Sequence, residues 1–259
     1  MIGVFDSGFG GLSVLDAIAR LLPRADLTYL ADTAHVPYGD KPDEFITGRV
    51  LAIGRHLAAQ GCDLIVVACN TATTTAIQAL RDSLPGIPIV GIEPGVKPAA
   101  QSSQTKHIAV LATEATANSK RLAHLIATHA AHIRVDVVPC PGWATHVETL
   151  KPFTGEFRAE VADKIRPLLA AGVDRIVLGC THYAFLKPSI QPLLHPHIEL
   201  VDVAEAVARQ VVRLGGERTG HGELVLQATA RPQRLQVALP MLGLTTLAER
   251  SVPAQLVRP

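Results

Sequence analysis

One local pattern occurs twice in this chain, and it constrains the fold more than any other feature. Residues 66–73 (Val-Val-Ala-Cys-Asn-Thr-Ala-Thr) and 177–183 (Val-Leu-Gly-Cys-Thr-His-Tyr) each run from an apolar segment through a cysteine and a nearby threonine into a helix-like segment. In α/β proteins, ligands bind at the carboxyl ends of buried parallel strands. The pattern therefore predicts a cysteine, Cys69 or Cys180, on each side of a cleft.

The rest of the chain alternates short apolar segments with amphipathic ones, which is typical of parallel sheets covered by helices. Strands are expected at residues 2–5, 27–31, 64–68, 87–91, 107–111, 133–138, 174–178, 198–201 and 223–229. Helices are expected at residues 12–22, 43–60, 73–84, 115–131, 144–150, 155–170, 202–214 and, in part, 233–244, before a frayed end. The fold class is α/β, and the two halves, about 1–94 and 95–205, look like one unit used twice.

Composition narrows the function. Of the 259 residues, 48% are hydrophobic and 18% charged, which supports a substantial core. Lys and Arg number 24 against 23 Asp and Glu, without a basic stripe, so nucleic-acid binding has no support. No apolar run reaches the about 18 residues of a membrane span, and no signal-peptide pattern opens the chain. We expect a cytoplasmic protein with reduced thiols and no metal site, because no Cys-x-x-Cys pair occurs.

Cys69 and Cys180 are the candidate catalytic bases. Inverting a carbon next to a carboxylate requires one group to remove a proton and a second group to return one to the opposite face. A thiol suits both tasks because its unperturbed pKa of about 8.5 lies close to neutrality. Free cysteines are also common as small buried residues, and we expect Cys62 and Cys140 to be of that kind.

Each candidate thiol has a titratable neighbour. Asp6 follows the first expected strand and should reach the same rim as Cys69, and His182 lies two residues after Cys180. Each neighbour could pass a proton to or from its thiol. Their alternative roles are those of a helix cap and a polar first-turn residue.

A glycine-rich turn at residues 7–11 (Ser-Gly-Phe-Gly-Gly) follows Asp6. We expect its backbone N–H groups to hold a substrate carboxylate. The turn also resembles a dinucleotide-binding fingerprint with Asp32 as the ribose ligand. Two features speak against that interpretation, since Ser13 replaces the third glycine and Asp6 would place a carboxylate beside a pyrophosphate.

Together these residues resemble the glutamate racemase family, within the aspartate/glutamate racemase superfamily. The matching stretches are residues 3–12 (Gly-Val-Phe-Asp-Ser-Gly-Phe-Gly-Gly-Leu), 37–39 (Pro-Tyr-Gly), 68–73 (Ala-Cys-Asn-Thr-Ala-Thr), 91–95 (Gly-Ile-Glu-Pro-Gly), 111–113 (Leu-Ala-Thr) with Thr116, and 178–183 (Leu-Gly-Cys-Thr-His-Tyr). They occur in the family's order and span most of residues 2–205. The ordered set is far more specific than any one stretch.

The resemblance implies a cofactor-independent enzyme that interconverts L- and D-glutamate and supplies D-glutamate for peptidoglycan. It implies that Cys69 acts on the D-enantiomer and Cys180 on the L-enantiomer, assisted by Asp6 and His182, with Glu148 as a further acidic group. Positions matching the family's substrate contacts are Asp6, Ser7, Pro37, Tyr38, Gly39, Asn70, Thr71, Thr113, Thr116, Thr181 and His182. The implied partner is the small-molecule substrate, with a homodimer as one option and no nucleic acid or membrane.

The family fold implied here has two similar α/β domains with the active site in the cleft between them. The C-terminal segment then returns to the first domain, which gives 1–94 with 207–259 for the first domain and 95–206 for the second. Residues 143–146 (Trp-Ala-Thr-His) depart from the family's Phe-Val-Pro-Leu, so the wall of the cleft near Glu148 is expected to differ.

Several alternatives stay open at this level. Aspartate or another acidic amino acid could be the substrate, because neutral donors do not select chain length. A decarboxylase relative would need only one active cysteine. A dinucleotide-binding oxidoreductase would use the glycine turn and Asp32, and a non-catalytic binding module would keep the fold without needing Cys69 or Cys180.

Overall fold

Two sheets form from the apolar segments in the computed structural model, which describes residues 1–151 and 153–259. The first has strand order β10-β9-β2-β1-β3-β4 and the second β6-β5-β7-β8. The strands are β1 (Ile2–Asp6), β2 (Leu27–Ala31), β3 (Leu64–Val67), β4 (Ile89–Gly91), β5 (His107–Ala112), β6 (Arg134–Pro139), β7 (Arg175–Leu178), β8 (Glu199–Val201), β9 (Leu224–Ala228) and β10 (Gln255–Leu256). Every residue of β1, β2, β3 and β7 is buried, as expected for parallel strands covered on both faces.

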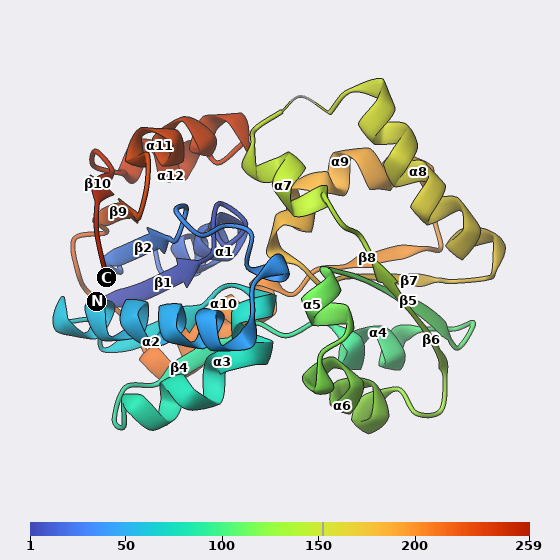
Figure 1. The fold of residues 1–259 in the computed structure, drawn as a ribbon, viewed down its shortest axis with the longest axis horizontal. Helices are drawn as coiled ribbons and strands as arrows, with labels where there is room; N and C mark the ends of the chain where they lie inside the picture. The colour runs from blue at the N-terminus through green and yellow to red at the C-terminus, as the bar shows by residue number, and fades with distance from the viewer. Residues whose placement is uncertain (152) are drawn as a thin grey trace.

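Figure 1 shows the two sheets side by side, each flanked by its own helices. Around the first sheet lie α1 (Leu12–Leu21), the 3₁₀ turn η1 (Tyr38–Asp40), α2 (Asp43–Ala59), α3 (Asn70–Ser83), α10 (Ala204–Gly215), α11 (Pro232–Met241) and α12 (Thr245–Arg250). Around the second lie α4 (Val96–Ser102), α5 (Glu114–Ala117), α6 (Lys120–His129), α7 (Trp143–Glu148), α8 (Gly155–Ala170), η2 (Thr181–Leu186), α9 (Lys187–Ile190) and η3 (Gln191–Leu193). The predicted α/β fold class is confirmed.

The C-terminal segment joins the first sheet. Strand β9 pairs in parallel with β2, and β10 extends the same edge beyond β9. The sequence predicted a frayed chain end, and this prediction is wrong. Arg250 holds the segment by donating hydrogen bonds to the backbone carbonyls of Gly222, Ala19 and Ala25. The side chain of this one arginine ties the C-terminal segment to the segment around α1.

Helix boundaries differ from the sequence expectations at two informative places. Helix α3 begins at Asn70 rather than near residue 73, because Cys69 caps it and accepts a hydrogen bond from Ala72 N. The expected helix at 115–131 is two helices, α5 and α6, since Ser119 caps a new helix through Leu122 N. Sequence periodicity also missed α4, and the helix-like segment expected after Cys180 is a run of short helical turns over 181–193.

Helix α7 is held in place by Trp143, one of the four residues that depart from the family pattern. Trp143 is fully buried, packs edge-on against Tyr183, and donates from Nε1 to Glu160 Oε1 at 3.0 Å. The Tyr183 hydroxyl in turn donates to Cys140 O at 3.0 Å. This packing positions Glu148, the last residue of α7.

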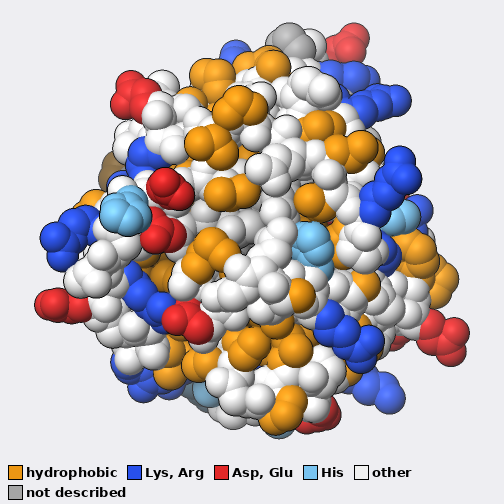
Figure 2. Space-filling view, turned by 90° about the vertical axis from the view of Figure 1, so that its left-hand side faces the viewer, with side chains coloured by type: hydrophobic (Ala, Val, Ile, Leu, Met, Phe, Trp, Pro, Cys, Tyr) orange, Lys and Arg blue, Asp and Glu red, His pale blue; other side chains and the backbone are white. Residues whose placement is uncertain are grey.

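No helix in the described ranges has both the length and the apolar character needed to cross a membrane. Figure 2 shows the face on which both chain termini lie in Figure 1, where positive and negative side chains are interspersed with hydrophobic groups. This face presents mixed charge and no single-sign field.

Candidate active site

Both cysteines of the repeated pattern lie at strand ends, and each begins a helical segment. Cys69 follows β3 and is the N-cap of α3, while Cys180 follows β7 and is the N-cap of η2. Only 5% of Cys69 and 7% of Cys180 is exposed, so both sulfurs are shielded from bulk water. Asp6, at the end of β1, lies at the same rim because β1 pairs with β3.

The Cys69 thiol is held in its neutral form. Burial and the nearby Asp6 carboxylate raise the pKa of Cys69 well above its ordinary value, and the Cys180 side chain adds to this effect. The sulfur accepts from Ala72 N at 3.4 Å and lies 3.8 Å from Ser7 Oγ. The Ser7 hydroxyl donates to Asp6, and Asp6 accepts from Thr181, the residue after Cys180, so a hydrogen-bonded chain connects the two cysteine segments.

Cys180 has a different environment. Its sulfur lies 3.8 Å from Nδ1 of His182, whose Nε2 lies 2.9 Å from Glu148 Oε2. Burial lowers the pKa of His182, but hydrogen bonds to Cys180 and Glu148 outweigh that effect and raise it well above the ordinary value. The His182 ring therefore lies between the sulfur of Cys180 and the carboxylate of Glu148, so it can carry a proton between them.

Asp6 links the two halves of the site. Its fully buried carboxylate accepts from Gly8 N at 2.7 Å, from Ser7 Oγ at 3.2 Å and from Thr181 Oγ1 at 2.9 Å. Burial raises the pKa of Asp6, although the charge of His182 and these hydrogen bonds act in the opposite direction. The carboxyl group thus connects the end of β1 with the segment that follows β7.

The glycine turn holds carboxylates, but they belong to the protein. Gly8 N donates to Asp6, Phe9 N donates to Glu148 Oε2 at 2.8 Å, and Gly10 N lies 3.3 Å from His182 Nε2. A Cβ atom at Gly8 would overlap the Glu148 carboxylate, and one at Gly10 would overlap the His182 ring. The N–H groups of Gly8, Phe9 and Gly10 therefore face Asp6, Glu148 and His182, and the substrate cradle on this turn stays a prediction.

Three threonines from both halves form a second polar cluster. Thr71 Oγ1 lies 3.2 Å from Thr113 Oγ1 and 3.4 Å from Thr116 Oγ1, so α3 contacts α5. Gly39 approaches Thr113 closely, which places the expected contact segment 37–39 against this cluster. Beside it, Asn70 is 3% exposed, and neither its Oδ1 nor its Nδ2 has a hydrogen-bond partner among the described residues. A buried amide with both atoms unpaired is rare in folded proteins and indicates a ligand position.

Tyr38 and Asp32 belong to one hydrogen-bonded network. Tyr38 Oη donates to Asp32 Oδ2 at 2.6 Å, and Arg49 and Thr229 supply the remaining donors to the fully buried Asp32 carboxylate. The Tyr38 hydroxyl is therefore engaged within the protein. Both oxygens of Asp32 accept hydrogen bonds from protein groups, and the N–H groups of Gly8 and Phe9 donate to protein carboxylates, so the dinucleotide alternative lacks these contacts for a ribose and a pyrophosphate.

The remaining cysteines, Cys62 and Cys140, are buried, as expected. Cys62 lies under β1 against Gly3, and burial raises the pKa of its thiol to about 11. Burial likewise raises the pKa of Cys140 to about 12.

Sequence reasoning missed the residues that support the site. Arg49 and Thr229 complete the Asp32 network, and Arg234 donates from Nη2 to Glu148 O at 3.0 Å. These residues lie far from the cysteine motifs, in segments whose local patterns signal only helix and strand. Glu148 itself is only 7% exposed, although its sequence context is that of an ordinary surface glutamate.

Comparisons with known proteins agree with this geometry. The sequence profile described as Asp/Glu/hydantoin racemase matches residues 2–211. A glutamate racemase from Ectopseudomonas mendocina is 45% identical over 246 residues, covering 93% of this chain and 94% of the relative. The crystal structure of Escherichia coli glutamate racemase, in complex with L-glutamate and the activator UDP-MurNAc-Ala, has a TM-score of 0.86 at 30% identity and covers 99% of this chain and 97% of that one. The glutamate racemase isoform RacE1 from Bacillus anthracis has a TM-score of 0.87 at 28% identity, with coverages of 100% and 97%.

Proposed function

This chain belongs to the Asp/Glu/hydantoin racemase family, and from that premise we propose that it interconverts L- and D-glutamate by proton transfer between Cα and two thiols. The relative from E. mendocina and the E. coli structure both concern glutamate racemases, and the latter contains L-glutamate. The observation that carries the mechanism is the asymmetry of the two buried cysteines. The sulfur of Cys69 lies 3.8 Å from Ser7 Oγ and near the Asp6 carboxylate, whereas the sulfur of Cys180 lies 3.8 Å from Nδ1 of His182.

Substrate binding would use the donors and acceptors that the protein leaves unpaired. Asn70 Nδ2 can donate to a substrate carboxylate and its Oδ1 can accept from the ammonium group, which would satisfy both of its buried atoms. The hydroxyl groups of Thr71, Thr113 and Thr116 lie within hydrogen-bond distance of one another and can turn toward a carboxylate. These four side chains are short and neutral, so they would bind the substrate through hydrogen bonds rather than through a salt bridge.

The proposed reaction balances without a cofactor. The Cys180 thiolate takes the Cα proton of L-glutamate and becomes a thiol, while His182 and Glu148 keep the local charge paired. The resulting planar carbanion takes the proton of Cys69 on its other face and becomes D-glutamate. The Cys69 thiolate formed in this step is disfavoured by burial and by Asp6, which promotes its reprotonation.

We further propose that the reaction supplies D-glutamate for peptidoglycan and that it takes place in the cytoplasm. A pair of thiols that exchange protons must stay reduced, and reducing compartments keep them so. All four cysteines are free thiols.

Racemisation in D₂O tests the proposed function. L-glutamate and, separately, L-aspartate are incubated with the enzyme, and optical rotation and proton NMR follow inversion and the loss of the Cα proton. We expect inversion of glutamate, with solvent deuterium in the D-glutamate that forms, and slower or no inversion of aspartate. The Cys62→Ala variant, which removes a buried thiol outside the site, should behave as wild type. Product that keeps its protium under conditions of rapid thiol exchange would contradict the mechanism, and absence of turnover would contradict the function.

A further inference from the structure

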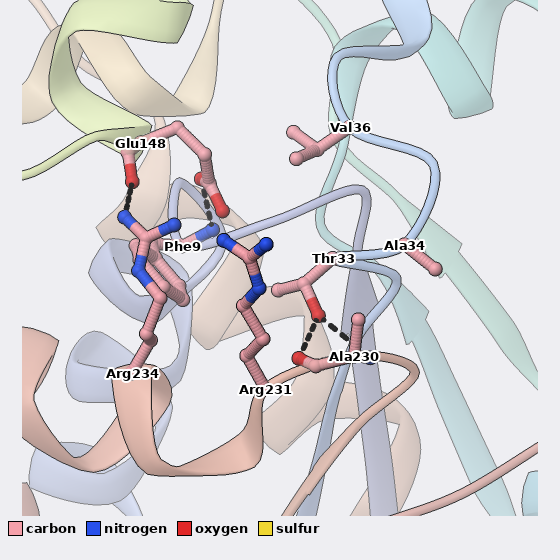
Figure 3. A pocket seen from close by; sticks show the side chains of 8 residues that line it. All are labelled: Phe9, Thr33, Ala34, Val36, Glu148, Ala230, Arg231 and Arg234. Atoms are coloured by element: carbon pink, nitrogen blue, oxygen red, sulfur yellow. Dashed lines mark hydrogen bonds between the residues drawn. The ribbon is translucent and has the colours of Figure 1, made fainter.

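A cavity of about 320 Å³ lies beside Glu148 and is lined by Arg231, the N-cap of α11, and by Arg234 within that helix. Figure 3 shows the guanidinium groups of Arg231 and Arg234 on the side of this cavity that faces Glu148 and Phe9. Helix α11 spans Pro232–Met241, so both arginines lie beyond residue 211, where the family match ends. The two arginines make different contacts, and the difference carries the inference.

Arg234 contacts Glu148 itself and also Phe9, whose backbone N–H binds the Glu148 carboxylate. Its Nη2 donates to the backbone carbonyl of Glu148 at 3.0 Å, and its guanidinium lies over the Phe9 ring at 5.9 Å from the centroid. Phe9 N in turn donates to Glu148 Oε2 at 2.8 Å, the same oxygen that lies 2.9 Å from His182 Nε2. One partly buried side chain therefore touches the carbonyl of Glu148 and the ring of the residue that binds its carboxylate.

We propose that Arg234 is a positioning residue, which fixes Glu148 against the glycine turn so that its carboxylate stays in line with His182 and Cys180. The proposal rests on the proposed function, since Glu148 and His182 matter only if Cys180 exchanges a proton with substrate. Arg234 reaches Glu148 from a helix of the C-terminal segment, whereas Glu148 belongs to α7 beside the second sheet. The packing of the C-terminal segment thereby sets the geometry of the groups beside Cys180. In the part of the chain that the structure describes, Arg234 makes no direct contact with Cys69.

Arg231 provides a matched control. It lines the same cavity and carries the same charge, but its side chain is exposed, and no hydrogen bond or ion pair is found for it among the described residues. A general effect of positive charge near Glu148 would appear in variants of either arginine. A specific contact would appear only in variants of Arg234.

The test compares Arg234→Met, Arg234→Lys and Arg231→Met. We expect kcat to fall about tenfold in Arg234→Met, the size of one hydrogen bond from a charged donor, with Arg234→Lys in between and Arg231→Met as wild type. Because the two enantiomers have equal free energy in solution, kcat/KM must change equally in both directions. The informative measurement is therefore the isotope effect on kcat/KM with Cα-deuterated L- and D-glutamate.

If Arg234 acts through Glu148, proton transfer at Cys180 becomes more rate-limiting in Arg234→Met. The isotope effect should then rise for the enantiomer deprotonated by Cys180 and fall for the enantiomer deprotonated by Cys69. An equal change for both enantiomers, or an equal effect in Arg231→Met, would overturn the proposal while wild-type racemisation upholds the function. Loss of stability without the opposed isotope effects, measured by thermal unfolding, would identify Arg234 as merely structural and would also overturn it.

Discussion

Nε2 of His182 lies 2.9 Å from Oε2 of Glu148, and both side chains are almost completely buried. These residues are 34 positions apart in the chain, and Glu148 ends α7 while His182 lies in η2. This pair raises the pKa of His182 next to Cys180, whereas Cys69 contacts Ser7 Oγ and Ala72 N and lies near the Asp6 carboxylate. The two thiols therefore lie in different environments, as a two-base reaction requires of its two bases.

Glu148→Gln removes the charge of this pair and keeps its shape. We expect kcat for both enantiomers to fall about 10- to 100-fold, because one buried hydrogen bond between charged groups is lost. Steady-state racemisation measures the effect. Glu249→Gln, an exposed change on α12, is the matched control. Wild-type turnover in Glu148→Gln would show that the imidazolium does not depend on this carboxylate.

Asp6→Asn should change how stability depends on pH. Burial raises the pKa of Asp6 in the folded state, so the folded protein holds this proton more tightly than the unfolded chain. Wild type therefore loses stability as pH rises from about 3.8 through the raised pKa, and Asn, which does not titrate, escapes this loss. We expect the unfolding free energy of the variant, relative to wild type, to increase with pH in urea titrations. The exposed Asp163→Asn variant should show no such trend, and a flat difference for Asp6→Asn would refute the assignment.

Gly10→Ala tests the close approach of the turn to His182. A Cβ atom there would overlap the imidazole ring and Thr181 Oγ1, so we expect a loss of about 1–3 kcal/mol in stability and a large loss of activity. Gly48→Ala in α2 meets nothing within 4 Å and should stabilise the protein by about 0.5–1 kcal/mol with unchanged kinetics. Thermal unfolding and kcat are measured for both. Normal activity in Gly10→Ala would mean that the turn can move away from His182 without consequence.

Arg49→Met leaves the buried Asp32 carboxylate without its cation. Asp32 is 0% exposed and Arg49 donates to it through Nε and Nη2, so we expect a loss of about 3 kcal/mol in unfolding free energy. KM should rise more than kcat falls, since the Tyr38 hydroxyl also binds Asp32 and the contact segment 37–39 would lose its support. Urea unfolding and steady-state kinetics check both effects. An unchanged KM would separate this network from substrate binding.

Sequence patterns gave the strands around both cysteines because continuous apolar runs with short turns allow few other folds. Asp6, Cys69 and Cys180 were predictable as rim residues, since each directly follows such a run. Glu148 was found through family resemblance, because its burial depends on how α7 packs around Trp143. The contacts of Glu148 and His182 with the glycine turn were not predictable. Each contact joins two residues far apart in the sequence, with a separation of 139 positions for Phe9 and Glu148 and of 172 for Gly10 and His182.

The sequence also could not predict the roles of Arg49, Thr229 and Arg234. Each acts through one contact across the tertiary structure, and an arginine on an amphipathic helix has the same local pattern whether it binds a distant carboxylate or water. Asn70 was recognised as a site residue, but only the structure reveals that both its polar atoms lack partners.

The most direct measurement of the central claim is Cα-proton exchange in D₂O by Cys69→Ala and Cys180→Ala, each supplied with each enantiomer and followed by proton NMR. Neither variant should racemise glutamate. Cys69→Ala should still exchange the Cα proton of L-glutamate, and Cys180→Ala that of D-glutamate, because one thiol remains on the matching face. Inversion at an undiminished rate in either variant, or the same enantiomer preference in both, would contradict the assignment of two thiols to opposite faces of one carbon.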